Sequence, residues 1–190
     1  AVISSSIGAA LEWFDIIVYA TFATVIARNF YPDSDPVFAL ILTFATFAIS
    51  YLIRPLGGLV LGSYADRKGR KSALSLTLLL MMVGTLIMAL APTYAQVGMW
   101  AGIIILLSRL IQGFSAGGEF GTATAFLIET APHKKAFYSS WQVASQGASM
   151  LLASAFGFAL TEGLSEEALN SWGWRVPFFV GLLIGPVGLY

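Results

Sequence analysis

The chain contains no cysteine and only one histidine among its 190 residues. Without cysteine it forms no disulfide and has no thiol chemistry. The one histidine, His133, lies in a basic segment and has no second histidine or cysteine to complete a metal site or a nucleophile–base pair. We therefore expect no enzyme activity, no metal and no other cofactor.

Charged residues are also scarce. They make up 11% of the chain, whereas 57% of the residues are hydrophobic and the mean hydropathy is +0.80. A soluble domain has about 25% charged residues because its surface faces water, so this composition predicts a chain embedded in the lipid bilayer. The formal net charge is +0, which supplies no basic excess for displacing phosphate counterions. We therefore expect no nucleic-acid partner.

The chain also lacks a start methionine and a polar or basic N-terminal segment, and its last apolar run, residues 176–190, is short for a membrane span. We expect that both ends are cut. Glu12 and Asp15 interrupt the first apolar stretch, which argues against a cleaved signal peptide.

Long apolar runs dominate the rest of the sequence. No residue between Lys71 and Arg109 is formally charged, and the turn-forming segment 92–98 divides this stretch in two. A membrane span needs about 20 apolar residues. The pattern therefore predicts six helices, near residues 3–27, 37–63, 72–91, 98–128, 138–161 and from 176 onward.

Basic residues are concentrated in alternate loops of this pattern. Two loops hold Arg67, Lys68, Arg70, Lys71, Lys134 and Lys135, whereas the other loops hold only Arg28 and Arg175. Because Lys and Arg accumulate on the cytoplasmic side, the N-terminus is expected in the cytoplasm. The outer interface would then be anchored by Tyr94, Trp100, Trp172 and Trp174.

A conspicuous motif joins the second and third predicted helices. Its order is G-x-x-x-D-R-x-G-R-K, formed by Gly62, Asp66, Arg67, Gly69, Arg70 and Lys71. A topology signal alone explains the cations but not the aspartate or the glycines. The motif resembles the signature loop of the major facilitator superfamily of secondary transporters. We expect a tight cytoplasmic loop whose charges form a network that closes the cytoplasmic side.

Five formal charges lie inside predicted spans: Glu12, Asp15, Arg54, Arg109 and Glu119. A charge at mid-membrane costs about 2.5 to 3.5 kcal/mol on insertion scales, so such residues usually pair or line a water-filled path. Structural ion pairing and an aqueous cavity both remain open. Glu12 and Asp15 are three residues apart and therefore share one helix face.

In the fourth span, Arg109 begins the pattern R-x-x-x-G-x-x-x-G with Gly113 and Gly117. Close helix packing explains the glycines, but packing does not require a cation. The pattern resembles the superfamily's fourth-helix motif, which implies that Arg109 takes part in proton coupling. The glycine-rich segment 117–121 is not a nucleotide site, because it lies in a membrane helix with no preceding strand.

Four segments resemble the metabolite–proton symporter branch of that superfamily: residues 11–15, 54–58, 109–119 and 172–178. Members of this branch carry citrate and other carboxylates, 2-oxoglutarate, shikimate, proline or betaine. Segment 137–146 is most similar to the citrate and tricarballylate carriers, although the rest of the fifth helix matches less closely. The fifth helix lacks the G-P-x-x-G pattern associated with antiporters, which favours symport.

The resemblance implies an all-α membrane protein of the bacterial inner membrane. Residues 1–190 would form one bundle, the first six helices of a twelve-helix fold, as two inverted three-helix repeats. The first and fourth helices would line the solute path. The second and fifth would meet a C-terminal six-helix half that is absent from the sequence.

The sequence favours an organic acid, such as citrate or another di- or tricarboxylate, as the solute. Arg54 and Arg109 are the only cations within the spans, and the planar arginine fork matches a carboxylate. Gln142 and Gln146, one turn apart, can donate to carboxylate or hydroxyl oxygens, although polar packing explains them almost as well.

A proton is expected to accompany the solute. Its carrier must become neutral during the cycle, so the candidates are Glu12 and Asp15, and then Glu119, acting with Arg109. If these carboxylates instead neutralise the arginines, the cavity suits a zwitterion such as proline or betaine. A proton-conducting or scaffold membrane protein without a carried solute needs only the buried charges and is a third interpretation.

Overall fold

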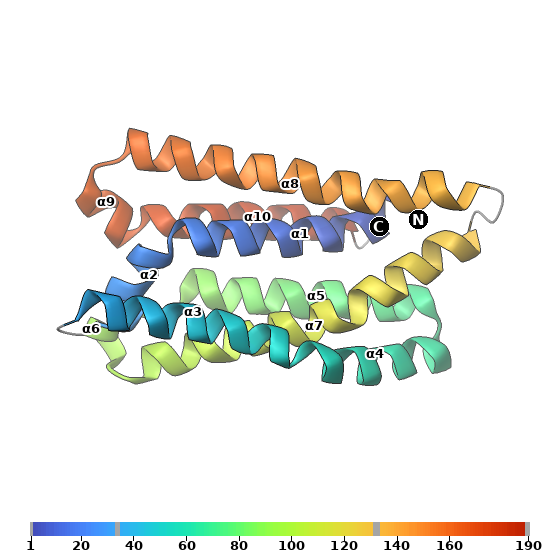
Figure 1. The fold of residues 1–190 in the computed structure, drawn as a ribbon, viewed down its shortest axis with the longest axis horizontal. Helices are drawn as coiled ribbons and strands as arrows, with labels where there is room; N and C mark the ends of the chain where they lie inside the picture. The colour runs from blue at the N-terminus through green and yellow to red at the C-terminus, as the bar shows by residue number, and fades with distance from the viewer. Residues whose placement is uncertain (1, 33–34, 131–133, 189–190) are drawn as a thin grey trace.

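The structure is a computed structural model that describes residues 2–32, 35–130 and 134–188. His133 lies outside the described residues. Within these ranges every regular element is helical. The long helices lie side by side along one axis (Figure 1).

The helices begin and end near the predicted positions. In chain order they are α1 (Val2–Thr21), α2 (Ala23–Phe30), α3 (Pro36–Leu52), α4 (Arg54–Lys68), α5 (Arg70–Leu90), α6 (Tyr94–Val97), α7 (Trp100–Thr130), α8 (Lys135–Gly163), α9 (Glu166–Ser171), the 3-10 helix η2 (Gly173–Arg175) and α10 (Val176–Gly188).

Four of the described helical stretches are long and apolar enough to cross a membrane: Pro36–Lys68, Arg70–Leu90, Trp100–Phe126 and Ser139–Gly163. The bent pair Ser6–Thr21 and Ala23–Phe30 is a fifth if the two helices form one span. A shorter apolar helix covers Gly173–Leu183. The prediction of an all-α membrane protein is therefore confirmed.

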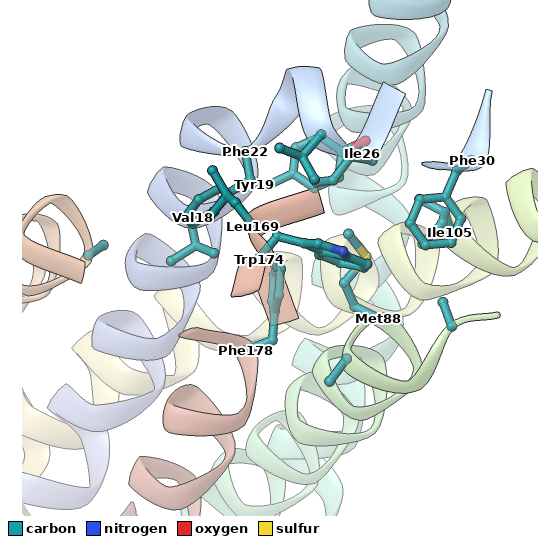
Figure 2. Close-up of a cluster of buried hydrophobic side chains, with 14 of the residues drawn as sticks. Val18, Tyr19, Phe22, Ile26, Phe30, Met88, Ile105, Leu169, Trp174 and Phe178 are labelled. Carbon is teal, nitrogen blue, oxygen red and sulfur yellow. The ribbon is translucent and has the colours of Figure 1, made fainter. Parts of the chain in front are cut away.

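The first predicted helix, residues 3–27, is not straight. The chain bends by 70° between α1 and α2. Figure 2 shows Phe22, Ile26 and Phe30 in the same buried cluster as Trp174. After the bend, α2 therefore packs against a segment about 150 residues further along the chain. Apolarity along the chain predicts a helix but not its direction, because the direction depends on which distant side chains it packs against.

The predicted loop over residues 62–71 is wrong in its extent. Helix α4 continues to Lys68 and α5 begins at Arg70, so only Gly69, at a φ of 92°, separates them. Arg67 and Lys68 lie in the last turn of α4, where cations interact favourably with the helix dipole. Glycine adopts the positive φ of a helix terminus without strain.

The two ends of the bundle are named here by their turns. The Gly69 end contains the α4–α5 turn and the ends of α7 and α8 that face each other (Figure 1). The opposite Gly98 end contains α2, α6 and α9, and Gly98 has a φ of 61°.

The main apolar core lies toward the Gly98 end (Figure 2). Trp174 is fully buried there, and its ring contacts Phe30 edge-to-face at a centroid distance of 5.5 Å. Trp174 is therefore a core residue and not the interface anchor expected from its position in the sequence. Tyr94, Trp100 and Trp172 are exposed, as an interfacial role requires.

Glycines bring α7 into backbone contact with the second span. A Cβ atom at Gly113 or Gly117 would overlap the carbonyl oxygen of Ser50 or Arg54, and one at Gly57 would overlap that of Phe114. The prediction that these α7 glycines serve close helix packing is confirmed. The contact also holds Arg54 of α4 beside the part of α7 that carries Arg109.

Candidate functional site

A buried ion pair joins α1 to α7. Arg109 donates through Nη1 to Oδ2 of Asp15, and the two side chains are 3% and 6% exposed. Gln112 donates to the other carboxylate oxygen, Oδ1, at 3.0 Å, and also to Oγ1 of Thr85 at 3.1 Å. Both oxygens of Asp15 are therefore satisfied, and the network links α1, α5 and α7.

Aromatic rings hold the Arg109 guanidinium in place. Its central carbon lies 3.9 Å from the ring centroid of Tyr19 and 6.0 Å from that of Phe47. The Tyr19 hydroxyl donates to the backbone oxygen of Thr43 at 2.9 Å, which fixes that ring. Nε and Nη2 of Arg109 have no hydrogen-bond partner among the described residues. The cation is thus oriented by stacking and keeps two unused donor atoms.

A second ion pair lies nearby and is more accessible. Nη1 of Arg54 lies 2.7 Å from Oε1 of Glu12, with side-chain exposures of 28% and 13%. The Arg54 guanidinium is stacked 4.0 Å from the centroid of Tyr51. Its Nε also has no partner in the described part of the chain.

The two ion pairs line one small cavity. Its walls include Asp15, Glu12, Arg54, Arg109 and Gln112, and its free volume is about 20 Å³. This is room for about one water molecule. The four formal charges of the two pairs sum to zero, so the cavity is neutral when both pairs are intact.

Glu119 lies apart from this network. Its side chain is on α7, the residue is 3% exposed, and its carboxyl group sits against Gly8 of α1. Neither carboxylate oxygen has a hydrogen-bond partner among the residues that the structure describes.

Gln142 and Gln146 do not line the cavity between the arginines. Gln142 is 3% exposed, and its Oε1 accepts a hydrogen bond from Thr124 Oγ1 at 3.1 Å. Gln146 is half-buried. Gln142 therefore contacts α7 through Thr124, and the expected role of the two amides in solute binding stays a prediction.

The charges at the Gly69 end form a network across three helices. Asp66 Oδ1 lies 2.9 Å from Arg70 Nη1, and Arg70 Nε lies 3.6 Å from Glu129 Oε1. The network thus joins α4, α5 and the end of α7. Arg67 and Lys71 are exposed, and a Cβ atom at Gly62 would meet nothing within 4 Å.

The sequence analysis missed three residues of these sites. Gln112 lies three residues after Arg109 and so on the same helix face, a spacing that was available from the sequence. Tyr19 lies four residues after Asp15 and so also on the same helix face, but its contact with Arg109 depends on the packing of α1 and α7. Glu129 offers no such pattern, because its partner Arg70 is far away in the chain.

The family model described as "Sugar (and other) transporter" matches residues 1–189. The chain belongs to this family. The sugar (and other) transporters are part of the major facilitator superfamily, so the superfamily expected from the motifs is confirmed. The family and the relatives below are transporters and not enzymes, and the chain is a multi-pass membrane protein.

Two curated relatives are similar over almost the whole chain. A citrate-proton symporter of Klebsiella pneumoniae is 44% identical over 187 residues, which cover 98% of this chain and 42% of the relative. A proline/betaine transporter of Salmonella typhimurium is 40% identical over 191 residues, which cover 100% of this chain and 38% of the relative. This chain therefore spans about two fifths of the length of these relatives.

Among solved structures, the inward open conformation of the xylose transporter XylE from E. coli is similar in fold. The TM-score is 0.84 at 17% sequence identity, and the match covers 99% of this chain and 46% of that chain. The expected fold, one six-helix half of a major facilitator protein, is confirmed.

Proposed function

We propose that this chain is the N-terminal half of a proton-coupled symporter that carries an organic acid, such as a di- or tricarboxylate, by alternating access in the bacterial inner membrane. The Gly69 end and the N-terminus would face the cytoplasm. The observation that carries the proposal is the Asp15–Arg109 pair, a buried cation whose partner is a titratable carboxylate.

This pair couples a proton to an anion by competition. When Asp15 accepts a proton it becomes neutral and no longer holds the Arg109 guanidinium. The guanidinium then binds a carboxylate of the solute through its planar fork. When the proton leaves, Asp15 reclaims Arg109 and displaces the solute. The proton and the solute therefore each bind more tightly when the other is bound, which is what symport requires.

Several arginine N–H groups that line the cavity have no hydrogen-bond partner among the described residues, which favours a solute with many acceptor oxygens. Nε of Arg54 and both Nε and Nη2 of Arg109 have no partner among the described residues. A polycarboxylate supplies several acceptor oxygens to such donors. The similarity to a citrate-proton symporter agrees with this assignment.

Arg109→Lys tests whether the Arg109 guanidinium binds a carboxylate of the solute through two parallel hydrogen bonds. The substitution keeps the charge but removes the bidentate geometry and the stacking on Tyr19, so a carboxylate solute should bind at least about tenfold more weakly, a loss of about 1.4 kcal/mol. The measurement is thermal stabilisation of the purified full-length protein by citrate, dicarboxylates and shikimate. Arg28→Lys, at an exposed pair with Glu166, is the matched control.

A zwitterion such as proline or betaine is the second candidate. Both arginines are already paired with carboxylates, so the resting cavity has no net charge to attract an anion, and a proline/betaine transporter is also similar. Stabilisation by betaine with none by the acids would overturn the organic-acid assignment. Absence of solute-dependent proton uptake in vesicles would instead support a membrane protein without a carried solute.

The network at the Gly69 end is proposed to close the cytoplasmic side. Asp66→Asn removes the charge that pairs with Arg70 and should shift the full-length protein toward its inward-open state. Exposed ion pairs contribute about 0.2 to 1 kcal/mol, so the population ratio should change by up to about fivefold. Cysteine-accessibility labelling of cavity positions measures this shift.

A second variant of the network and a control variant complete the test of cytoplasmic closure. Glu129→Gln should act in the same direction as Asp66→Asn, because both carboxylates contact Arg70. Glu167→Gln, which is exposed on α9, should leave labelling unchanged. Unaltered labelling in both network variants, together with normal uptake, would contradict the gate.

A further inference from the structure

Glu119 is a buried carboxyl group without a counter-charge. The residue is 3% exposed, and neither oxygen accepts a hydrogen bond from any described residue. The other two acidic residues inside the spans predicted from the sequence differ, since Glu12 contacts Arg54 and Asp15 contacts Arg109.

No ion pair joins Glu119 to a cation among the described residues. On α1 the packed residue is Gly8. On α4, Leu61 packs against the adjacent Gly118, and Arg54 is held by Glu12. Residues 72–90 of α5, 136–161 of α8 and all of α3 carry no formal charge.

An ionised carboxylate in such a place is costly, because burial removes its hydration and nothing replaces it. A neutral carboxyl group avoids most of this cost. We propose that Glu119 is a proton-binding site distinct from the arginine-paired carboxylates, and that it holds a proton in the conformation described here. For its role in transport, the inference rests on the proposed symport function.

Further polar atoms lie on the Gly69 side of this site. Ser145 Oγ of α8 donates to the backbone oxygen of Ser6 at 3.0 Å, and Thr124 Oγ1 donates to Gln142 at 3.1 Å. Ser6 Oγ and Gln142 Nε2 are buried and have no partner among the described residues. These groups lie on α1, α7 and α8, between Glu119 and the Gly69 end in the order of each helix.

Gly8 is the positioning residue of the site. A Cβ atom there would overlap the Glu119 carboxyl group. The absence of a side chain at residue 8 is what allows the carboxyl group to lie between α1 and α7. Relative motion of these two helices during the transport cycle would expose the carboxyl group and release its proton.

Infrared spectroscopy tests the proton directly and does not depend on transport. The full-length protein at neutral pH should show a protonated carboxyl C=O band that shifts with isotopically labelled glutamate and is lost in Glu119→Gln. Glu119→Asp should move the band to the aspartate label, which keeps the test decisive if the glutamine variant does not fold. Persistence of the glutamate band in Glu119→Gln, or its loss in Glu12→Gln alone, would overturn the assignment.

Coupling is tested in vesicles with the membrane potential clamped. With the potential held at zero, each proton carried with the solute raises the supported accumulation by about tenfold per pH unit, because one pH unit is a tenfold change in proton activity. Glu119→Gln should lower the accumulation ratio by about tenfold per pH unit and weaken the pH dependence of uptake, since glutamine remains neutral at every pH and only the coupling through the Asp15–Arg109 pair is left. The exposed control Glu162→Gln should accumulate normally.

The two tests separate the possible failures. If the wild-type protein accumulates no solute, the proposed function fails, while the infrared result still decides whether Glu119 holds a proton. If Glu119→Gln accumulates solute as the wild type does, the coupling role is wrong even though symport stands.

Discussion

Asp15→Asn is expected to destabilise the protein by about 3 to 5 kcal/mol, because it leaves Arg109 as a buried charge without a counter-charge. The pair is almost fully buried, at 3% and 6% exposure, so water screens it little. Thermal or denaturant unfolding of the purified full-length protein in detergent measures the loss.

A double variant distinguishes the loss of the ion pair between Asp15 and Arg109 from a change in side-chain packing. Asp15→Asn combined with Arg109→Met removes both charges and should recover most of the stability, since apolar replacement of a buried pair is often neutral. Glu166→Gln breaks the exposed pair with Arg28, at 78% and 65% exposure, and should cost far less. Equal stability of Asp15→Asn and the wild type would show that the pair is not buried as described.

Gly113→Ala and Gly117→Ala are expected to destabilise the bundle by about 1 to 3 kcal/mol each, because the added methyl forces α7 away from the second span. Each methyl would overlap a backbone oxygen, of Ser50 or Arg54 respectively. A backbone atom cannot move aside as a flexible side chain does. Unfolding midpoints of the purified full-length variants measure the effect.

The control lies on the same helix. A Cβ atom at Gly121 would meet nothing within 4 Å, so Gly121→Ala should be neutral or stabilise α7 by up to about 1 kcal/mol through its better helix propensity. If Gly117→Ala and Gly121→Ala behaved alike, close contact between α4 and α7 would not be needed for stability.

The charged residues show which parts of the site the sequence predicts and which it does not. Charges are rare in apolar spans, so Glu12, Asp15, Arg54, Arg109 and Glu119 were identifiable as exceptional from their positions alone. Their partners were not. The structure joins Arg109 to Asp15 and Arg54 to Glu12, and it leaves Glu119 without a partner among the described residues.

The ion pairs at the Gly69 end show the same division. The spacing of Asp66 and Arg70 within one motif predicted their interaction, because four residues across a tight turn keep the side chains close. Glu129 completes the network from the end of α7. No local pattern indicates it, since the two residues meet only when α5 and α7 pack together.

By itself, the sequence determined that this is a helical membrane protein of the major facilitator superfamily, where its spans lie, and which residues carry charge inside them. These properties follow from composition, apolar run length and short motifs, all of which are local. Only the tertiary structure decided the 70° bend after α1, the burial of Trp174, the choice of ion-pair partners and the isolation of Glu119. Each of these depends on contacts between residues far apart in the chain, and such contacts exist only once the helices have packed.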